Sequence, residues 1–265
     1  MRFLILCGLC MALLAGCSPQ TNTEPPEGPP VIQLAPTWSA EIPLTDAPPY
    51  DPWVSLAPAA ASIAPAGEIL CSTPLPDGSE VLCYRAETDG DTKYWAIRRE
   101  DTLLPFCEET ACYTDGYAAE LFTDVLGQEG FRITAPRGAA YIARDYYTVD
   151  ESGTPRLLAA CANEVIEADL NGDGERELLW FYHGGREIFY IFRQEGILRE
   201  LCLTDVLAQQ AEPWLVIAVF PPAAEEGCLP VEALRGGWDA LSPEAEFLPA
   251  RLRFTAEAVS LEPLS

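Results

Sequence analysis

The chain repeats one pattern of strands, turns and cysteines, and this repeat limits the folds that it can adopt. Residues 95–107 (WAIRREDTLLPFC) align without a gap with residues 190–202 (YIFRQEGILRELC). Just upstream, residues 76–84 (PDGSEVLCY) align with residues 172–180 (GDGERELLW), and a weaker copy lies at 146–161. Matches that recur in the same order indicate a single supersecondary unit that is used more than once.

The second copy shows most clearly what the unit contains. Residues 164–168 alternate between apolar and polar side chains, residues 177–182 form a nearly continuous apolar run, and residues 187–193 and 197–203 are rich in strand-forming side chains. Alternation is typical of a half-buried strand, and a continuous apolar run is typical of a strand buried on both faces. Glycine-containing turns separate these segments. Four short antiparallel strands in a meander match one blade of a β-propeller.

We therefore expect a mainly β fold of antiparallel, four-stranded, blade-like repeats, with few short helices. The sequence shows two clear units and one faint unit, whereas closed propellers typically have about four to eight blades. A partial or open propeller-like arrangement, capped by strands near residues 250–261, and a closed ring both remain open. Short helices are expected at residues 118–126 and 204–211.

Residues 169–178 (DLNGDGEREL) place oxygen-bearing side chains at alternating positions of a short loop. Calcium prefers six to eight oxygen ligands in a flexible geometry, and a tightly curled loop can turn alternate side chains inward. In this interpretation the glutamate after the second glycine offers its backbone carbonyl, and the others offer side-chain oxygens. The candidate ligands are Asp169, Asn171, Asp173, Glu175 and Glu177. The alternative is a polar turn whose Asp and Asn side chains cap their own backbone.

The order of strand, D-x-N-G-D-G-x-x-E-L loop and hydrophobic strand resembles the calcium-loop repeats of the FG-GAP and VCBS group. The resemblance is confined to the loop and its flanks, and it implies a structural Ca²⁺ in a β-propeller or a related surface domain. An EF-hand would need an acidic residue at loop position twelve, where this chain has Trp180. The first copy has Thr73, Leu75 and Asp77 at the positions equivalent to the first three ligands, so we expect at most one site of this type.

The N-terminal residues predict export and a lipid anchor. A positive charge at Arg2 and an apolar run at residues 3–14 form a secretory signal. The stretch Leu14-Ala15-Gly16-Cys17 resembles the lipobox of bacterial lipoproteins, which implies cleavage just before Cys17 and attachment of diacylglycerol to its thiol. An ordinary signal peptide is the alternative. We expect a protein that is lipid-anchored to the cell membrane and faces outward.

Three domains follow from these observations. Residues 1–17 are the lipoprotein signal peptide and lipobox, residues 18–66 are a linker rich in Pro and Ala, and residues 67–265 are the β-repeat domain. Proline-rich linkers behave as semi-rigid spacers. Trp38 and Trp53 lie in the linker, and we expect them to dock on the domain.

Composition excludes some partners. The formal net charge of −25 argues against nucleic acid, because phosphates need a basic face. It also argues against direct binding to an anionic lipid surface. Of the ten cysteines, seven follow the lipobox, an odd number that leaves at least one unpaired. We expect most of them to be small buried residues.

The sequence offers little that indicates catalysis. The only histidine, His183, lies in a Gly-Gly turn, and no G-x-S-x-G, phosphate-binding glycine loop or H-E-x-x-H motif is present. The leading hypothesis is a non-catalytic binding or scaffolding module at the cell surface, with a glycan or a protein as its ligand. The alternatives are a glycan-active hydrolase that uses paired carboxylates and a subunit of an envelope assembly.

Overall fold

A computed structural model describes most of the chain beyond the N-terminal segment. The described residues are 38–50, 52, 66–87, 92–109, 115–138, 141–225 and 227–264. The chain divides into two compact units, Met1–Ala35 and Pro36–Ser265, and every described residue belongs to the second. The predicted signal peptide, Cys17 and Trp53 lie outside the described residues. None of the helices in the described ranges has the length and apolarity needed to cross a membrane.

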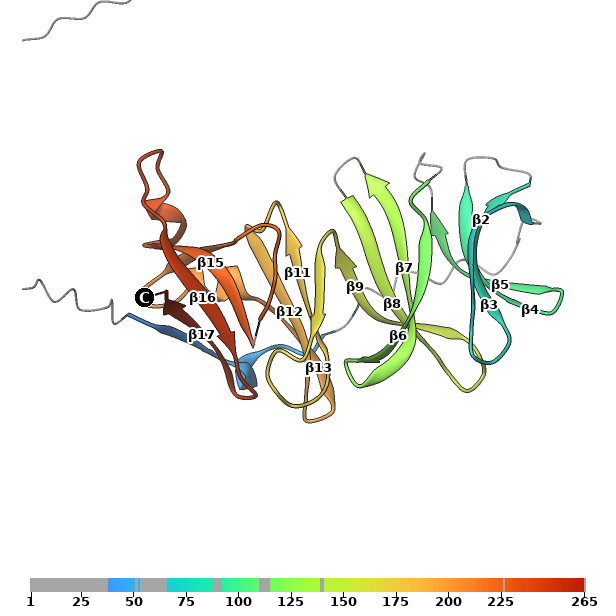
Figure 1. Cartoon of the computed structure of the whole chain (residues 1–265), viewed down its shortest axis with the longest axis horizontal. Helices are drawn as coiled ribbons and strands as arrows, with labels where there is room; N and C mark the ends of the chain where they lie inside the picture. Colours follow the sequence, from blue (N-terminus) through green and yellow to red (C-terminus); the bar gives the residue numbers. More distant parts are fainter. Residues whose placement is uncertain are drawn as a thin grey trace, which may run out of the picture. The chain divides into compact units, whose positions relative to one another are not determined.

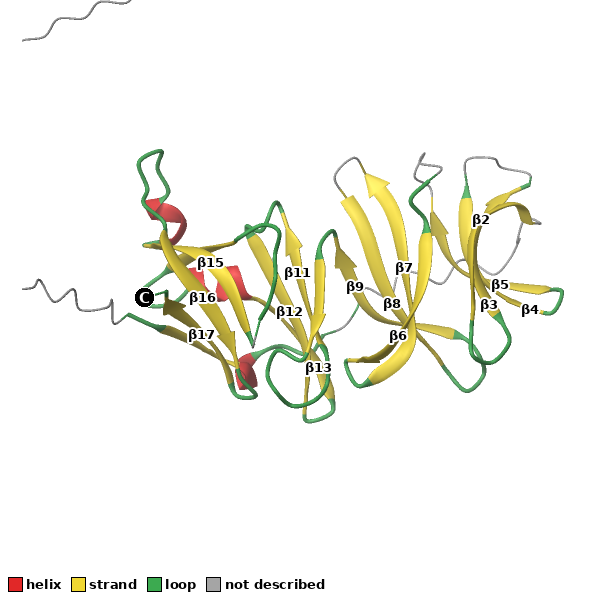
Figure 2. Ribbon diagram, viewed as in Figure 1, coloured by secondary structure: helices red, strands yellow, loops and turns green. Residues whose placement is uncertain are grey.

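The fold is mainly β, as the repeat predicts, and three of its four sheets are four-stranded antiparallel meanders (Figures 1 and 2). Sheet 1 contains β2 (Ala66–Pro74), β3 (Glu80–Ala86), β4 (Lys93–Arg99) and β5 (Thr102–Glu109). Sheet 2 contains β6 (Ala118–Val125), β7 (Gln128–Gly138), β8 (Tyr141–Val149) and β9 (Pro155–Ala162). Sheet 3 contains β10 (Val165–Ala168), β11 (Glu177–Tyr182), β12 (Glu187–Gln194) and β13 (Ile197–Cys202). The two clear sequence copies correspond to sheets 1 and 3, and the faint copy belongs to sheet 2.

The remaining strands form a fourth sheet, which has five strands instead of four. Sheet 4 has the order β1-β17-β16-β15-β14, so its first strand comes from the beginning of the described chain. Its strands are β1 (Ala40–Pro43), β14 (Trp214–Ala218), β15 (Cys228–Arg235), β16 (Leu248–Phe254) and β17 (Ala258–Pro263). The helical elements among the described residues are α1 (Leu203–Ala208) and the short 3₁₀ segments η1 (Leu44–Asp46) and η2 (Gly237–Ala240). The helix expected at residues 204–211 is confirmed in its first turns.

Hydrophobic clusters join each sheet to the next one along the chain. Trp95 and Phe106 of sheet 1 pack with Phe131 and Tyr147 of sheet 2. A second cluster joins sheet 2 to sheet 3, and the largest cluster joins sheet 3 to sheet 4. Among the described residues, no cluster joins sheet 1 to sheet 4. This pattern fits an open series of blade-like sheets.

A buried ionic group reinforces the contact between sheets 1 and 2. Arg137 of β7 donates to Glu109 of β5 at 2.7 Å and to Asp145 of β8 at 2.8 Å. Both carboxylates are almost fully buried, with relative exposures of 3% and 1%. Buried charges are tolerated when they are paired in this way. Burial is the main cause of the raised pKa of Asp145, and the Arg137 guanidinium opposes it.

The end of the proline-rich segment is part of the fold and acts as a strap across three sheets. β1 pairs antiparallel with β17, and Trp38 stacks on Trp214 with ring centroids 4.3 Å apart. Farther along, the Tyr50 amide donates to the Leu198 carbonyl of sheet 3 at 2.8 Å. The Tyr50 hydroxyl accepts a hydrogen bond from the Ala160 amide of sheet 2 at 2.9 Å. The docking predicted for Trp38 is confirmed, and residues 38–50 of the predicted linker belong to the β domain.

The helix expected at residues 118–126 is wrong, because these residues form β6 and the turn that follows it. The side chains of Phe122 and Val125 are both buried although they are three positions apart, a spacing that suggests a helix. The structure explains the spacing by a register shift between these two residues in the pairing of β6 with β7. Such an irregularity changes which side chains face the core.

Candidate metal centre

The candidate metal centre is the loop that joins β10 to β11 in sheet 3. Ala168 and Glu177 are the last pair of the β10–β11 ladder, so residues 169–176 form the connection between the two strands. Gly172 and Gly174 have positive φ angles of 80° and 94°. Glycine adopts this left-handed region at no steric cost, which lets the loop curl tightly.

Alternate side chains hold the curl by accepting hydrogen bonds from the loop backbone. The two carboxylate oxygens of Asp169 accept from the Gly172 amide at 2.8 Å and from the Gly174 amide at 3.1 Å. Asn171 Oδ1 accepts from the Asp173 amide at 2.8 Å, and Asp173 Oδ1 accepts from the Glu175 amide at 2.8 Å. The loop therefore has the capped-turn geometry and also turns its side-chain oxygens toward one another.

Glu177, at the start of β11, binds the backbone at the beginning of the loop. Its side chain is buried, with 1% relative exposure for the residue, and Oε2 accepts from the Leu170 amide at 2.7 Å. Burial, and then repulsion from Asp173 and Asp169, raise the pKa of Glu177 to about 8 against backbone hydrogen bonds that lower it. Each of these three acids places a carboxylate oxygen within 4.8 Å of the others.

The structure thus brings together three of the predicted ligands, namely Asp169, Asp173 and Glu177. Asn171 lies beside them, since its Nδ2 donates to Asp173 Oδ2 at 3.0 Å. The side chain of Glu175 faces Arg193 instead, with 3.7 Å between Oε2 and Nε. Its predicted contribution is the backbone carbonyl, and that role stays a prediction.

A tyrosine that sequence reasoning missed lies under the same loop. Tyr190 of β12 is fully buried, and its hydroxyl makes no hydrogen bond of standard geometry within the described ranges. The charges of Glu177, Asp173 and Asp169 raise its pKa further than burial alone. A side-chain interaction with Asn171 of the loop has the opposite effect and lowers this pKa. The oxygen-only set of carboxylates in the loop fits a hard cation such as Ca²⁺.

The loop also fastens sheet 3 to sheet 2. The Leu126 amide donates to the Arg176 carbonyl at 2.7 Å, and the Arg176 side chain donates to the carbonyls of Thr123 and Asp124. Arg193 of β12 donates to the Leu126 carbonyl through Nε at 3.0 Å and Nη2 at 2.8 Å. Sequence reasoning missed this clamp, because its two sides lie about fifty residues or more apart in the chain.

The equivalent turn of sheet 1 has a different set of contacts. The Thr73 hydroxyl donates to the Ala119 carbonyl of sheet 2 at 2.6 Å, and Leu75 is buried. Asp77 Oδ1 accepts from the Ser79 amide at 2.9 Å, and this hydrogen bonding lowers the pKa of Asp77. The first copy therefore makes an Asp-Gly turn of similar sequence without a group of acids.

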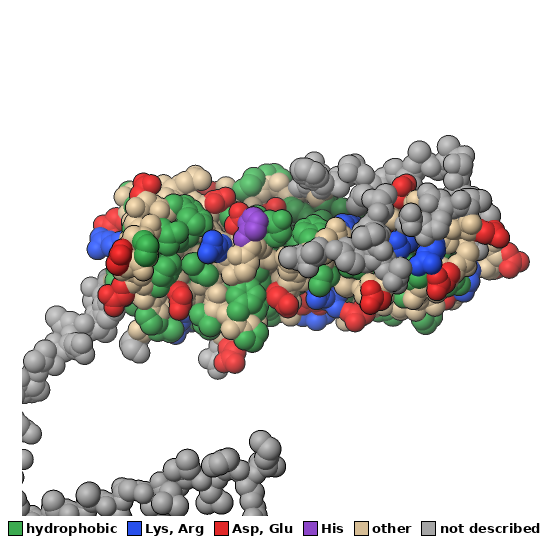
Figure 3. Space-filling view, turned by 90° about the horizontal axis from the view of Figure 1, so that it is seen from above, with side chains coloured by type: hydrophobic (Ala, Val, Ile, Leu, Met, Phe, Trp, Pro, Cys, Tyr) green, Lys and Arg blue, Asp and Glu red, His purple; other side chains and the backbone are tan. Residues whose placement is uncertain are grey.

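The other candidate residues lie apart from the loop or outside the described ranges. His183, in the β11–β12 turn, is exposed, and its Nδ1 lies 3.2 Å from Glu187 Oε2. The six cysteines in the described ranges are free thiols, and three of them are buried. Acidic side chains are spread over the visible face of the molecule, among exposed hydrophobic groups (Figure 3).

Comparison of the chain with protein-family models, with curated proteins and with solved structures finds no match. The resemblance to the FG-GAP and VCBS group thus stays a prediction from the loop sequence.

Proposed function

We propose that this chain is an exported lipoprotein whose β domain is a calcium-stabilised binding or scaffolding module. The observation that supports this best is the group of three carboxylates with oxygens within 4.8 Å of one another, on the loop that clamps sheet 3 to sheet 2. Like charges held this close repel one another unless protons or a cation neutralise them. A bound Ca²⁺ would supply that neutralisation.

The residues that would hold the ion are those that the sequence predicts. Asp169, Asp173 and Glu177 would offer carboxylate oxygens, Asn171 would offer its amide oxygen, and Glu175 would offer its carbonyl. Arg176, which follows Glu175, makes hydrogen bonds to sheet 2. A rigid loop would therefore also fix the contact between sheets 2 and 3.

The burial of Glu177 favours a structural role over the glycan-hydrolase alternative. A general acid must lie within hydrogen-bond reach of the substrate atom that it protonates. Glu177 is almost fully buried, and its Oε2 already accepts hydrogen bonds from the Leu170 and Asn171 amides. The raised pKa of this carboxyl group therefore has a structural explanation.

The proposed site of action is the outer face of the cell membrane, with Cys17 as the lipidated residue and the proline-rich segment as a spacer. A glycan or a protein would be the ligand. The net charge of −25 supports a site of action outside the cell membrane, because it favours solubility and disfavours binding to nucleic acid.

Calorimetry of the full-length chain tests the calcium site. Extracellular calcium modules commonly have dissociation constants of roughly 10⁻⁴–10⁻³ M. Calcium at ten times the dissociation constant should raise the free energy of unfolding by about 1.4 kcal/mol, from RT ln(1 + [L]/Kd). For a domain of this size that amounts to a rise of a few degrees in Tm.

Three variants make the test specific. Asp169→Asn and Asp173→Asn keep one carbonyl oxygen for the turn but remove a negative charge, so each should abolish most of the calcium-dependent rise in Tm. Asp77→Asn is the matched control, since Asp77 caps a similar turn without neighbouring acids, and it should keep the full rise. A parent protein with neither a calcium-dependent Tm shift nor a heat of binding would refute the site.

A further inference from the structure

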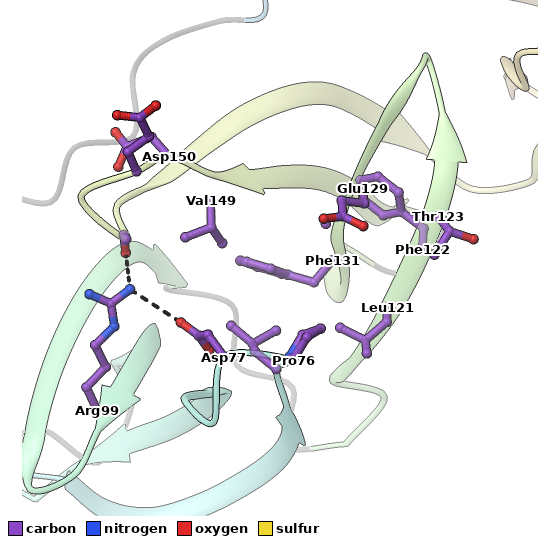
Figure 4. Close-up of a pocket in the computed structure, with 14 residues that line it drawn as sticks. Pro76, Asp77, Arg99, Leu121, Phe122, Thr123, Glu129, Phe131, Val149 and Asp150 are labelled. Atoms are coloured by element: carbon purple, nitrogen blue, oxygen red, sulfur yellow. Dashed lines mark hydrogen bonds and ion pairs between the residues drawn. The ribbon is translucent and has the colours of Figure 1, made fainter.

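A pocket opens between sheets 1 and 2, away from the metal loop. Its cavity volume is about 370 Å³, and its walls come from turns of both sheets (Figure 4). Sheet 1 contributes the β2–β3 turn and Arg99 of β4, and sheet 2 contributes β6, the start of β7 and the β8–β9 turn. This volume falls within the range of roughly 300–1,000 Å³ that is usual for small-molecule sites.

The floor of the pocket is apolar and firmly packed. Leu75, Phe122 and Phe131 line it, and each is at least nine-tenths buried. Phe131 stacks on Tyr147, with ring centroids 5.5 Å apart and an angle of 12° between the rings. At the edge, Leu121 is 48% exposed although it is a large aliphatic side chain. Such a surface gains from contact with an apolar group that removes it from water.

One end of the pocket is closed by a bridge between the two sheets. Arg99 donates to the Ser152 carbonyl at 3.3 Å. It also donates to the Gly153 carbonyl at 3.2 Å and lies 3.7 Å from Asp77 (Figure 4). A Cβ atom at position 153 would lie 1.5 Å from the guanidinium, so only glycine leaves room for the bridge. The charge of Arg99 is directed at protein acceptors, and it is balanced by the neighbouring aspartate.

The remaining charges on the pocket wall are negative. Asp150 is held by its own turn, since it accepts hydrogen bonds from the Ser152 and Thr154 amides and from Arg156. Glu129 and Glu151, in contrast, make no hydrogen bond or ion pair with any described residue. Figure 4 shows the Glu129 side chain on the same side of the cavity as the Phe131 ring. An apolar floor with uncompensated carboxylates at the rim is complementary to a cation that has an apolar body.

We propose that this pocket binds a small organic cation, with its apolar part against Leu75, Phe122 and Phe131 and its ammonium group at the acidic rim that carries Glu129 and Glu151. The inference goes beyond the proposed function, because a small organic cation is a ligand in addition to the glycan or protein proposed for the binding module. It does not depend on the calcium loop or on the lipid anchor.

Three probes of the same shape and different charge test the proposal. Tryptamine is a cation near neutral pH, tryptophol is neutral, and indole-3-acetate is an anion, while all three carry the same indole body. Binding to the full-length chain is measured by calorimetry at low ionic strength, where charge effects are least screened. We expect tryptamine to bind about tenfold more tightly than tryptophol, and indole-3-acetate to bind more weakly still.

Substitutions locate the site. Glu129→Gln and Glu151→Gln should each weaken tryptamine binding about two- to fivefold, the effect typical of an exposed ion pair, and should leave tryptophol binding unchanged. Leu121→Trp fills the edge of the pocket from an exposed position and should weaken both ligands. Glu257→Gln removes an exposed carboxylate in the turn between β16 and β17, far along the chain from the pocket residues, and should change neither.

Several results would overturn the proposal. These are equal affinity for the three probes, a tryptamine affinity that neither Leu121→Trp nor Glu129→Gln changes, and no binding at millimolar tryptamine. Binding of a lysine-rich peptide without binding of tryptamine would assign the surface to a protein partner and would also overturn it. Repeating the titrations with calcium and with chelator keeps the two proposals separate, since loss of the calcium response with intact tryptamine binding refutes only the metal site.

Discussion

Replacing Glu177 with glutamine should stabilise the protein in chelator above pH 4.5 and should weaken its response to calcium. The folded protein holds the pKa of Glu177 at about 8, against an ordinary value of 4.5. Between these two values the folded state binds one proton more than the unfolded state does. In chelator, the free energy of unfolding of the parent should therefore fall as pH rises from 4.5 to 8, and should level off above that window.

The size of this effect follows from the width of the window. Each pH unit contributes about 1.4 kcal/mol, so the buried carboxyl group costs about 3 kcal/mol at pH 7 and about 5 kcal/mol above pH 8, as upper values. Glutamine is neutral at every pH and keeps a carbonyl oxygen for the Leu170 amide. In chelator, Glu177→Gln should thus be more stable than the parent at pH 8, by a few kcal/mol, and equal to it near pH 4.5.

Urea denaturation at a series of pH values measures the difference. Other buried acids, such as Glu200 with its raised pKa, also make the free energy of unfolding depend on pH. They do so equally in the parent and the variant, so the difference between the two proteins removes their contribution. In calcium the difference between the two proteins should become smaller, by about 1.4 kcal/mol at ten times the dissociation constant, because the ion stabilises the ionised parent and the variant lacks that carboxylate ligand. Parallel stability curves for the two proteins in chelator between pH 5 and pH 8 would refute the reasoning.

Three further predictions follow from the contacts between sheets and from the N-terminus. Arg137→Met leaves two buried carboxylates without their partner and should lower the free energy of unfolding, measured in urea, by about 3–5 kcal/mol. Arg235→Met breaks an exposed ion pair and should lower it by less than about 1 kcal/mol. Equal losses in the two variants would contradict this prediction. Tyr50→Phe leaves the Ala160 amide without its acceptor and should cost about 1–3 kcal/mol, with faster hydrogen exchange at that amide as the specific sign. Cys17→Ser should remove metabolic lipid label from the protein, and equal labelling of parent and variant would exclude the anchor.

The parts of the fold that could be predicted are those encoded by adjacent residues. The apolar run at 177–182 and the Gly-Gly turn after it correspond to β11 and its hairpin. The three acids of the metal loop lie within nine residues of sequence, so the D-x-N-G-D-G-x-x-E pattern was enough to identify them together.

Context decided the parts that could not be predicted. The tetrapeptide TDVL occurs twice, and at residues 204–207 it lies in α1. At residues 123–126 it ends a strand, where Asp124 and Leu126 take positive φ angles of 60° and 53°. The difference lies in what each copy packs against, since the copy at residues 123–126 hydrogen-bonds to Arg176 in the clamp between sheets 2 and 3. Local sequence carries no signal of such a contact.

The same reason explains which site residues were missed. Tyr190 reaches the metal loop from a neighbouring strand, and the pocket between sheets 1 and 2 is assembled from several separate turns. The strap was assigned to a linker because its many prolines suggest a spacer, yet β1 occupies the edge of sheet 4, where proline is tolerated.

The pairing of β1 with β17 sets an order of events for a chain that is delivered N-terminus first. Sheets 1, 2 and 3 are each made from one continuous stretch of chain and can form as soon as that stretch is available. β1 emerges before all of them, but its partner is the last strand of the protein. Contacts between residues so distant in sequence form slowly, because a long loop must close first. Sheet 4 is therefore the last to be completed, and a chain that stops short of β17 leaves the strap without the strand that holds it.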